Sequence, residues 1–396
     1  MSKIIRRELT DELLLSASEY PVVTVIGPRQ SGKTTLVRSQ FPKHGYANLE
    51  NPEWRELAQR DPKAFLARFP PPVIFDEIQR VPSLLSWIQV LADEQRGVKG
   101  QWILTGSNQL QLRESVTQSL AGRTALLTLL PLSLQELEGR HDDWTYAEWI
   151  HCGFLPRIYD QGIRPLRAWR DYYQTYVERD VRQLIALENQ LLFERFVKLL
   201  AGRVGQLINL SSMSGEVGVS LPTLGKWLSI LEASFVIFRL PPYHRNFGKR
   251  LNKSAKLYFT DPGLAAYLLG IENPAQLERD PLVGGLFENL VVVEALKSRT
   301  HRGHDPNLYF FRDHNGKEVD LLYPDGNEVI PFEIKSAQTF DASFAKGIYY
   351  FQKLSQSNRA GRIIYAGDTE FASEHYEVRN FKSAFTHYGV KDGHGW

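Results

Sequence analysis

The stretch from Val22 to Thr35 constrains the fold of this chain more than any other. It reads VVTVIGPRQSGKTT, a β-branched apolar run followed by a glycine-containing loop, a lysine and two threonines. The apolar run predicts a buried strand, and the residues after the lysine predict a helix. Glycines let the intervening backbone turn tightly and direct several N–H groups at one anion, which the positive end of the helix also faces. The stretch therefore predicts a phosphate-binding loop.

The positions of this loop have distinct expected roles. We expect Lys33 to reach the β- and γ-phosphates of ATP and the Thr34 hydroxyl to contact Mg²⁺. A solvated lysine after a glycine-rich turn is the alternative, and the strand before the loop argues against it. The residues expected to surround the nucleotide are Gly27, Pro28, Arg29, Gln30, Ser31, Gly32, Lys33, Thr34, Thr35 and, further along the chain, Asp76.

Two acidic residues follow the next strongly apolar run. Val73–Phe75 predicts a strand that leads directly into Asp76 and Glu77. We expect Asp76 to hold Mg²⁺, in part through water, and Glu77 to orient and deprotonate the water that attacks the γ-phosphate. A pair of solvated acids at a strand end is the alternative, but the phosphate-binding loop upstream favours the catalytic interpretation.

Two further residues are candidates for sensing or stabilising the γ-phosphate. Trp102–Gly106 predicts a strand followed by Ser107 and Asn108. A polar side chain at this position lies beside the phosphate, and we favour Asn108, with a helix N-cap as the alternative. Arg123 is expected to reach the nucleotide of a neighbouring subunit as an arginine finger. A plain arginine after a glycine helix cap is the alternative for Arg123.

The order of several short motifs resembles a known family, the prokaryotic AAA+ ATPases with a C-terminal domain of unknown function. The resemblance covers nearly the whole chain. It implies an α/β nucleotide-binding core with a helical lid over residues 1–190, and it allows ring assembly. Cys152 stands where the family usually has glycine. The motifs that carry the resemblance are Gly27–Gln30, Leu49–Pro52, Phe75–Gln79, Leu104–Ser107, Ala121–Arg123, Pro131–Ser133, Cys152–Pro156 and Tyr176–Val181.

Residues 191–260 predict a winged-helix domain. Three helical segments are followed by two strands, a pattern typical of helix-turn-helix proteins with a wing. The segment between the strands is basic and without acids, which together with Lys226 on the second helix of the motif favours contacts with DNA phosphates. A solvated loop on a domain that contacts proteins is the alternative. The basic residues of this segment are Arg245, Lys249, Arg250 and Lys253.

Residues 261–396 carry four side chains in an order that suggests a metal-dependent site. A predicted hairpin brings Asp320 on one strand close to Glu333 and Lys335 on the other, and Glu288 lies on a preceding helix. Paired carboxylates suit Mg²⁺ or Mn²⁺, and the lysine can steady a hydroxide or a phosphate charge. The set resembles the PD-(D/E)xK restriction-endonuclease-like superfamily, without the proline before the first acid. A charged hairpin or an inactive nuclease fold is the alternative.

The length, charge and cysteine count of the chain limit the classes of protein to which it can belong. The chain has 396 residues, with 47 basic and 45 acidic, so bulk charge gives no argument for a nucleic-acid partner. The single cysteine excludes an internal disulfide and fits a reducing compartment, and no apolar run is long enough for a membrane span. We expect a cytoplasmic, homo-oligomeric α/β ATPase that acts on DNA. A non-cleaving, nucleotide-dependent switch that binds nucleic acid or protein is the alternative, and a small-molecule kinase is a weaker one.

Overall fold

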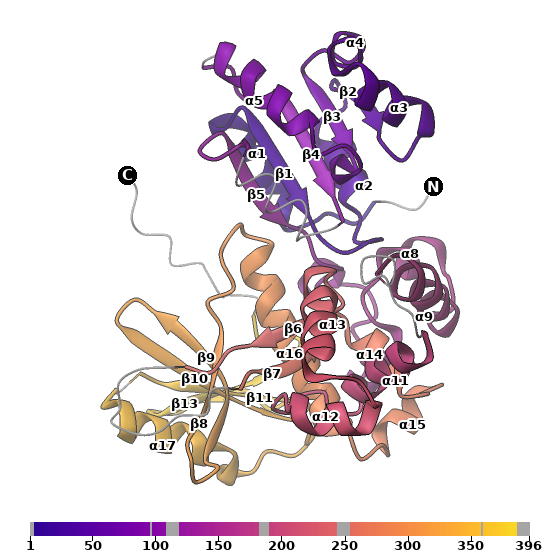
Figure 1. Ribbon diagram of the computed structural model, residues 1–396. Helices are drawn as coiled ribbons and strands as arrows, with labels where there is room; N and C mark the ends of the chain where they lie inside the picture. The colour runs from indigo at the N-terminus through magenta and orange to yellow at the C-terminus, as the bar shows by residue number, and fades with distance from the viewer. Residues whose placement is uncertain are drawn as a thin grey trace.

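The computed structural model describes residues 4–95, 97–107, 119–181, 190–243, 254–357 and 359–385. The predicted γ-phosphate sensor Asn108 and the four basic residues between the strands of the predicted wing lie outside these ranges. Figure 1 shows the N-terminal α/β part on one side of the molecule and the middle and C-terminal parts together on the other. No helix within the described ranges is long and apolar enough to cross a lipid bilayer.

A five-stranded parallel sheet forms the N-terminal part, in the order β2-β3-β4-β1-β5. The strands are β1 (Val22–Ile26), β2 (Gly45–Asn48), β3 (Val73–Asp76), β4 (Trp102–Gly106) and β5 (Thr124–Thr128). In a parallel sheet all carboxyl ends lie at one edge. The phosphate-binding loop after β1, Asp76 at the end of β3 and Ser107 after β4 therefore meet at this edge.

Helices cover both faces of this sheet, so β1 is buried along its whole length. Successive side chains of a strand point to opposite faces. Val23 and Val25 accordingly pack in a cluster with Leu9 and Leu13 of α1, whereas Val22 and Ile26 join the large cluster on the other face. The helices of this part are α1 (Leu9–Glu19), α2 (Lys33–Gln40), α3 (Pro52–Arg60), α4 (Pro62–Arg68) and α5 (Leu84–Glu94), with short 3₁₀ turns η1 (Ile78–Arg80) and η2 (Gln135–Leu137).

Helices follow the sheet and lead to a two-stranded antiparallel sheet. Ser220 caps α13 by accepting a hydrogen bond from the Thr223 N–H, and Pro222 lies in the first turn, as the sequence predicts. From residue 190 to residue 259, three helices precede two antiparallel strands, which is the order on which the winged-helix prediction is based. The elements are α7 (Tyr146–Cys152), α8 (Pro156–Gln161), α9 (Pro165–Tyr172), the π-helix η3 (Tyr173–Val181), α11 (Gln190–Ala201), α12 (Leu210–Val217), α13 (Leu221–Ala233), β6 (Ile237–Leu240) and β7 (Lys256–Phe259).

The C-terminal part is a six-stranded mixed sheet in the order β12-β13-β11-β10-β9-β8. The predicted hairpin is present: β9 and β10 are antiparallel, and Asp325 pairs with Glu328 across the turn at Gly326 and Asn327. The elements are α14 (Pro262–Leu268), α15 (Pro274–Glu278), α16 (Val283–Thr300), β8 (Tyr309–Arg312), β9 (Glu318–Asp325), β10 (Glu328–Lys335), η4 (Ala342–Ala345), α17 (Lys346–Ser355), β11 (Gly361–Tyr365), β12 (Phe371–Ala372) and β13 (Tyr376–Asn380).

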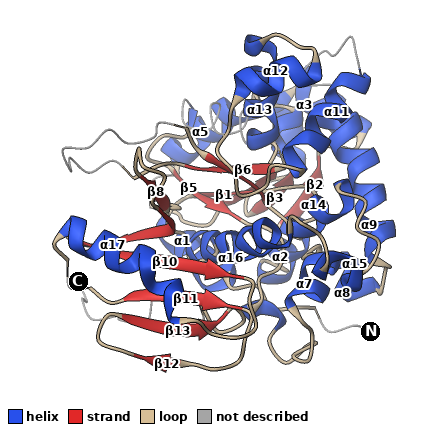
Figure 2. Cartoon of the chain, turned by 90° about the horizontal axis from the view of Figure 1, so that it is seen from below, coloured by secondary structure: helices blue, strands red, loops and turns tan. Residues whose placement is uncertain are grey.

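Helix α16 lies near the centre of the molecule (Figure 2). It packs against β10 of the C-terminal sheet, β7 of the small sheet and α7 of the helical region. The Asn289 side chain, which is fully buried, accepts from the Phe259 N–H (2.7 Å) and donates to the Phe259 carbonyl (2.9 Å). This amide thereby extends the edge of β7 as a neighbouring strand would.

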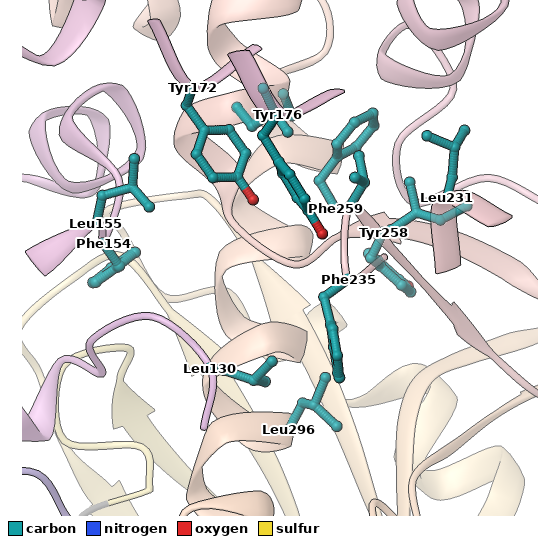
Figure 3. Packing of buried hydrophobic residues seen from close by; sticks show 14 of the residues in the cluster. Leu130, Phe154, Leu155, Tyr172, Tyr176, Leu231, Phe235, Tyr258, Phe259 and Leu296 are labelled. Atoms are coloured by element: carbon teal, nitrogen blue, oxygen red, sulfur yellow. The ribbon is translucent and has the colours of Figure 1, made fainter. Parts of the chain in front are cut away.

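Apolar and aromatic side chains from all three parts join in one continuous cluster. Figure 3 shows Leu130 beside Leu296 of α16, together with Phe235 from the segment before β6. Cys152 belongs to the same cluster, and burial raises the pKa of its thiol to about 12. This environment makes Cys152 a core residue rather than a nucleophile. The three parts therefore share a core.

Replacing Asn289 by alanine tests whether its amide links α16 to β7. The substitution leaves a buried N–H and a buried carbonyl of Phe259 unsatisfied, so we expect destabilisation of about 2–4 kcal/mol. Urea unfolding followed by circular dichroism measures this change. Asn315→Ala, at an exposed position, is the control and should leave the unfolding midpoint unchanged. Equal midpoints for both variants would contradict the assignment.

Candidate active sites

The loop after β1 needs glycine at two positions. Gly27 has φ of 154°, and a Cβ placed there would lie 2.0 Å from the Leu129 carbonyl oxygen. Gly32 has φ of 91°, in the left-handed region, and precedes the first residue of α2. Any other residue at Gly27 would collide with the backbone of the strand-to-lid connection. The loop is therefore fixed by close backbone packing.

Lys33 lies inside this loop. Its ammonium donates to the carbonyl oxygens of Gly27 (2.9 Å) and Pro28 (2.7 Å), and its side chain is buried. Burial lowers the pKa of Lys33 to about 8, against the opposing effect of the carboxylates of Glu77 and Asp76. The ammonium group is thus charged at neutral pH and held within the space enclosed by the loop.

The Asp76 carboxylate accepts hydrogen bonds from three hydroxyl groups. Thr34 Oγ1 lies 3.0 and 2.9 Å from its two oxygens, and the Tyr46 hydroxyl donates at 2.9 Å. The Thr105 hydroxyl of β4 is the third donor. The structure therefore brings together Thr34 and Asp76, the two expected Mg²⁺ contacts. Their hard oxygen atoms fit the chemistry of that ion.

Glu77 follows β3 with φ of 56°, a conformation that non-glycine residues adopt infrequently. Its Oε2 atom accepts a hydrogen bond from the Ser107 hydroxyl (2.9 Å) and another from the Gln79 side chain. Gln79 Nε2 also reaches Ser107 Oγ at 3.2 Å. The predicted catalytic acid is thus oriented by two neighbours, of which Gln79 has no role in the sequence interpretation.

The other predicted loop residues have different partners. Arg29 forms an ion pair with Glu50 (3.2 Å), and the carbonyl of Ser31 accepts a hydrogen bond from Arg7 (2.5 Å). Gln30 accepts from Arg157 of α8 at 3.5 Å. Thr35 lines a cavity of about 270 Å³ between the N-terminal segment, α2 and α8. Other residues lining this cavity include Ile5, Arg7, Gly32, Gln40, Pro156 and Asp160.

Arg123 lies at the opposite end of the sheet from the phosphate-binding loop. It precedes β5, whose first residue pairs with Val22 at the start of β1. Its guanidinium binds both carboxylate oxygens of Asp93 in α5, at 2.7 and 2.9 Å. The structure does not bring Arg123 to the nucleotide site of its own chain, and its action on a neighbouring subunit stays a prediction.

The predicted C-terminal residues also come together. The Lys335 ammonium contacts Asp320 at 2.9 Å and Glu333 at 2.6 Å, and the Ile334 N–H donates to the same oxygen of Asp320 at 2.8 Å. Glu333 is 5% exposed, and a Cβ at Gly347 in the first turn of α17 would overlap its carboxylate. The two strands and α17 therefore hold the carboxyl groups of Asp320 and Glu333 in one cluster with the partly exposed Lys335.

Glu288 of α16 faces the same region but has partners that the sequence interpretation did not include. Its Oε1 atom contacts Lys256 Nζ at 2.7 Å and accepts from the Tyr258 hydroxyl at 2.5 Å, both on β7. Lys256 also pairs with Glu318 on β9. Spacing along the chain gives no signal for these contacts. Lys256 and Tyr258 are two residues apart on β7, so their side chains share one strand face, and this is the only part of the arrangement that a sequence pattern indicates.

Burial and neighbouring charges shift the pKa values of Glu333 and Asp320 in opposite directions. Burial raises the pKa of Glu333 to about 8, and the charge of Asp320 adds to this effect. Burial also acts against ionisation of Asp320, but the ammonium groups of Lys335 and Lys256 lower the pKa of Asp320 below its ordinary value. One carboxyl is thus ionised and its neighbour protonated near neutral pH, which is a common arrangement in acid–base sites.

Comparisons with known proteins divide the chain into three segments. Residues 19–138 match the AAA domain, residues 143–275 a domain of unknown function (DUF8612) and residues 283–383 a domain of unknown function (DUF4143). An uncharacterized protein of Mycobacterium tuberculosis is 32% identical over 340 residues, covering 84% of this chain and 74% of that protein. A Mycobacterium bovis protein matches to the same extent.

More distant similarities extend to other organisms. An uncharacterized protein of Haemophilus influenzae is 24% identical over 368 residues, covering 84% of this chain and 88% of that protein. A Walker-type ATPase of Pyrococcus abyssi superposes with a TM-score of 0.46 at 16% identity, over 67% of this chain and 96% of that chain. A signal transduction ATPase of Pyrococcus horikoshii gives a TM-score of 0.24 at 12% identity, over 75% and 48% of the two chains.

The raised pKa of Glu333 predicts a pH-dependent stability. The unfolded chain releases this proton near the ordinary pKa of 4.5, whereas the folded chain keeps it up to about 8. The wild type should therefore lose stability relative to Glu333→Gln as the pH rises through this window. Thermal unfolding at a series of pH values measures the difference. Glu328→Gln, at an exposed position on the same strand, is the control, and a pH-independent difference for Glu333→Gln would contradict the shift.

Proposed function

Because the chain belongs to the family of these mycobacterial proteins and carries an AAA-type, P-loop ATPase domain, we propose that it binds ATP with Mg²⁺ and hydrolyses it. The observation that carries this proposal is the convergence of Lys33, Thr34 and Asp76 at one edge of the parallel sheet. Lys33 supplies positive charge within the loop, and the oxygens of Thr34 and Asp76 would hold Mg²⁺. When bound, this ion neutralises charge on the β- and γ-phosphates.

The environment of Glu77 supports its role in hydrolysis. A carboxylate that orients and deprotonates the attacking water must point in a defined direction. Hydrogen bonds from Ser107 and Gln79 restrict the Glu77 side chain to one orientation. Asn108, next to Ser107, remains the proposed γ-phosphate sensor. Arg123 remains the proposed finger in a homo-oligomeric ring.

The cavity beside α2 suits the nucleoside. It adjoins the loop at Gly32 and Thr35 and has a volume of about 270 Å³. Ile5 and Pro156 offer apolar surface to a purine ring, whereas Gln40 and Asp160 offer hydrogen bonds. Since Pro156 and Asp160 belong to the lid helices, a base in this cavity would join the lid to the core.

Two substitutions separate nucleotide binding from hydrolysis. Lys33→Ala removes the buried ammonium and should abolish measurable binding of a non-hydrolysable ATP analogue. Glu77→Gln should retain binding but lower the hydrolysis rate by about 10²–10⁴-fold. Calorimetry and phosphate release measure the two steps. Lys43→Ala, at an exposed position, is the control and should bind the analogue and release phosphate as the wild type does. Wild-type hydrolysis by the Glu77→Gln variant would exclude Glu77 as the base.

We further propose that the C-terminal site cleaves phosphodiester bonds of DNA with Mg²⁺ or Mn²⁺. Asp320 and Glu333 supply the carboxylate oxygens, Lys335 contacts both, and Glu288 lies on the adjoining helix. A divalent ion would be held by Asp320 and Glu333 and would activate water, while Lys335 would stabilise charge on the phosphate. The helices α12 and α13 and the basic segment after β6 are the proposed contacts with DNA, as in a winged helix.

Nicking of plasmid and linear DNA tests this second activity. The wild type should cut with Mg²⁺ or Mn²⁺, and Glu333→Ala and Lys335→Ala should both lower the rate by at least about 100-fold because each removes a group from the reacting centre. Glu328→Ala on the same strand is the control. Absence of cleavage by the wild type across both metals and both DNA forms would contradict nuclease activity.

One observation favours a non-cleaving alternative. The ammonium groups of Lys256 and Lys335 each contact two carboxyl groups, so all four acidic residues already have a cationic partner within the protein. Such a site can be a structural ion-pair network. The protein would then be a nucleotide-dependent switch that binds nucleic acid or a protein partner. Nucleotide-dependent DNA binding without cleavage would distinguish this function from the nuclease.

A further inference from the structure

A buried chain of polar contacts connects the phosphate-binding loop to α16. Arg7 donates to the Ser31 carbonyl in the loop (2.5 Å), to the Leu130 carbonyl (2.7 Å) and to Glu136 Oε1 (3.0 Å). The Arg7 side chain is 6% exposed and that of Glu136 is fully buried. His301, immediately after α16, lies with Nδ1 at 3.5 Å from the same oxygen of Glu136.

The protonation of His301 follows from its hydrogen bonds. The Leu130 N–H donates to Nε2 at 3.2 Å, so Nε2 is the acceptor and the proton of the neutral ring is on Nδ1. Burial lowers the pKa of His301 to about 3, which keeps the ring neutral. Nδ1 has no hydrogen-bond partner among the described residues, although it faces Glu136. This buried N–H is therefore one short movement away from a hydrogen bond.

A metal site does not account for this cluster. Glu8, Glu136 and His301 do place ligand atoms within 4.8 Å of one another. However, a metal would have to displace the proton from Nδ1 of His301 and compete with Arg7 for Glu136. The positive charge of Arg7 also opposes a second cation. Donor exchange on Glu136 is a better account than cation binding.

Helix α16 joins this cluster to the candidate C-terminal site. Glu294 accepts from the Leu134 N–H (2.8 Å), and Lys297 donates to the Leu132 carbonyl (2.7 Å), so the second half of the helix is bound to the ATPase domain. Glu288, about 20 Å from His301 along the helix at 1.5 Å per residue, lies at the other site. Movement of one end of a buried, continuous helix is transmitted to the other end.

We propose that Arg7, Glu136 and His301 transmit nucleotide occupancy from the phosphate-binding loop to α16, and thereby regulate the C-terminal site. Nucleotide binding shifts the Ser31 carbonyl and Arg7 with it. Glu136 Oε1 then accepts the Nδ1–H of His301 in place of the Arg7 N–H. The inference rests on the proposed function, because it requires ATP in the loop and a functional site around Glu288. Arg7 and Glu136 are positioning residues in this account.

Two substitutions at His301 separate the observed hydrogen bond at Nε2 from the one proposed at Nδ1. In Gln, the terminal amide can take the place of Nε2 and accept from Leu130, but no donor remains at the place of Nδ1. In Asn, the amide nitrogen takes the place of Nδ1 and can donate to Glu136, whereas the acceptor for Leu130 is lost. His304→Gln, an exposed histidine three residues further, is the matched control.

Hydrogen–deuterium exchange of the 396-residue chain, with and without a non-hydrolysable ATP analogue, measures the coupling between the phosphate-binding loop and α16. In the wild type and in H304Q, the analogue should change exchange in residues 286–297 by about fivefold or more. H301Q should bind the analogue but lose this change, whereas H301N should keep the change at a lower unfolding temperature. Should H301Q fail to fold, H301N decides: loss of the change in that variant overturns the proposal.

The outcomes distinguish the inference from the proposed function. An unchanged nucleotide effect in H301Q, or nucleotide binding by the wild type without any effect on residues 286–297, overturns the coupling alone. A wild type that binds no nucleotide overturns the proposed function and the coupling together.

Discussion

The position of the Asp76 carboxylate is the constraint on which the nucleotide site depends. Its hydroxyl donors Thr34, Tyr46 and Thr105 come from α2, β2 and β4. A buried polar group left without a partner costs about 1–3 kcal/mol, and more when it is charged. Asp76 is therefore stable only if β3 lies between β2 and β4 and if α2 begins beside it. The observed strand order and the start of α2 at Lys33 meet this requirement.

Helix α16 plays the corresponding part in joining the ATPase domain to the rest. Three of its charged residues lie in ion pairs that are largely buried: Lys297 with Glu294, and Glu288 with Lys256 of β7. Lys297 also donates to the Leu132 carbonyl, in the segment between β5 and the lid helices. The partner of Glu288, Lys256, lies on β7. Breaking one such contact would leave a charge buried without compensation. The three parts of the chain consequently behave as one packed unit around this helix.

Patterns within short segments predict much of this structure. The residues from Val22 to Thr35 predict β1, the loop and α2 because strand, glycine turns and helix start are adjacent in sequence. The hairpin that joins Asp320 to Glu333 is predicted for the same reason: a short turn determines which residues face one another. The helix-and-strand order from α11 to β7 also follows local patterns. The role of each site residue, however, stays a prediction.

Contacts between distant residues could not be predicted in this way. Arg7 and Glu136 are 129 residues apart, and Lys256 and Glu288 are 32 apart, with no periodicity to relate them. Their partners are set by how the sheets and α16 pack, which is a property of the whole fold. The sequence patterns also leave β5 (Thr124–Thr128) unpredicted, because this edge strand follows the turn at Gly122 but is mostly half-buried and has no β-branched apolar run. The side chains proposed to link the two candidate sites make contacts of this long-range kind, which local patterns do not predict.

Isothermal titration calorimetry of the 396-residue chain with a non-hydrolysable ATP analogue and Mg²⁺ tests whether the loop after β1 binds nucleotide. We expect one binding site per chain, with weaker binding when Mg²⁺ is chelated. A flat titration at millimolar analogue, with the protein shown to be folded, would contradict the assignment of Val22–Thr35 as a nucleotide site.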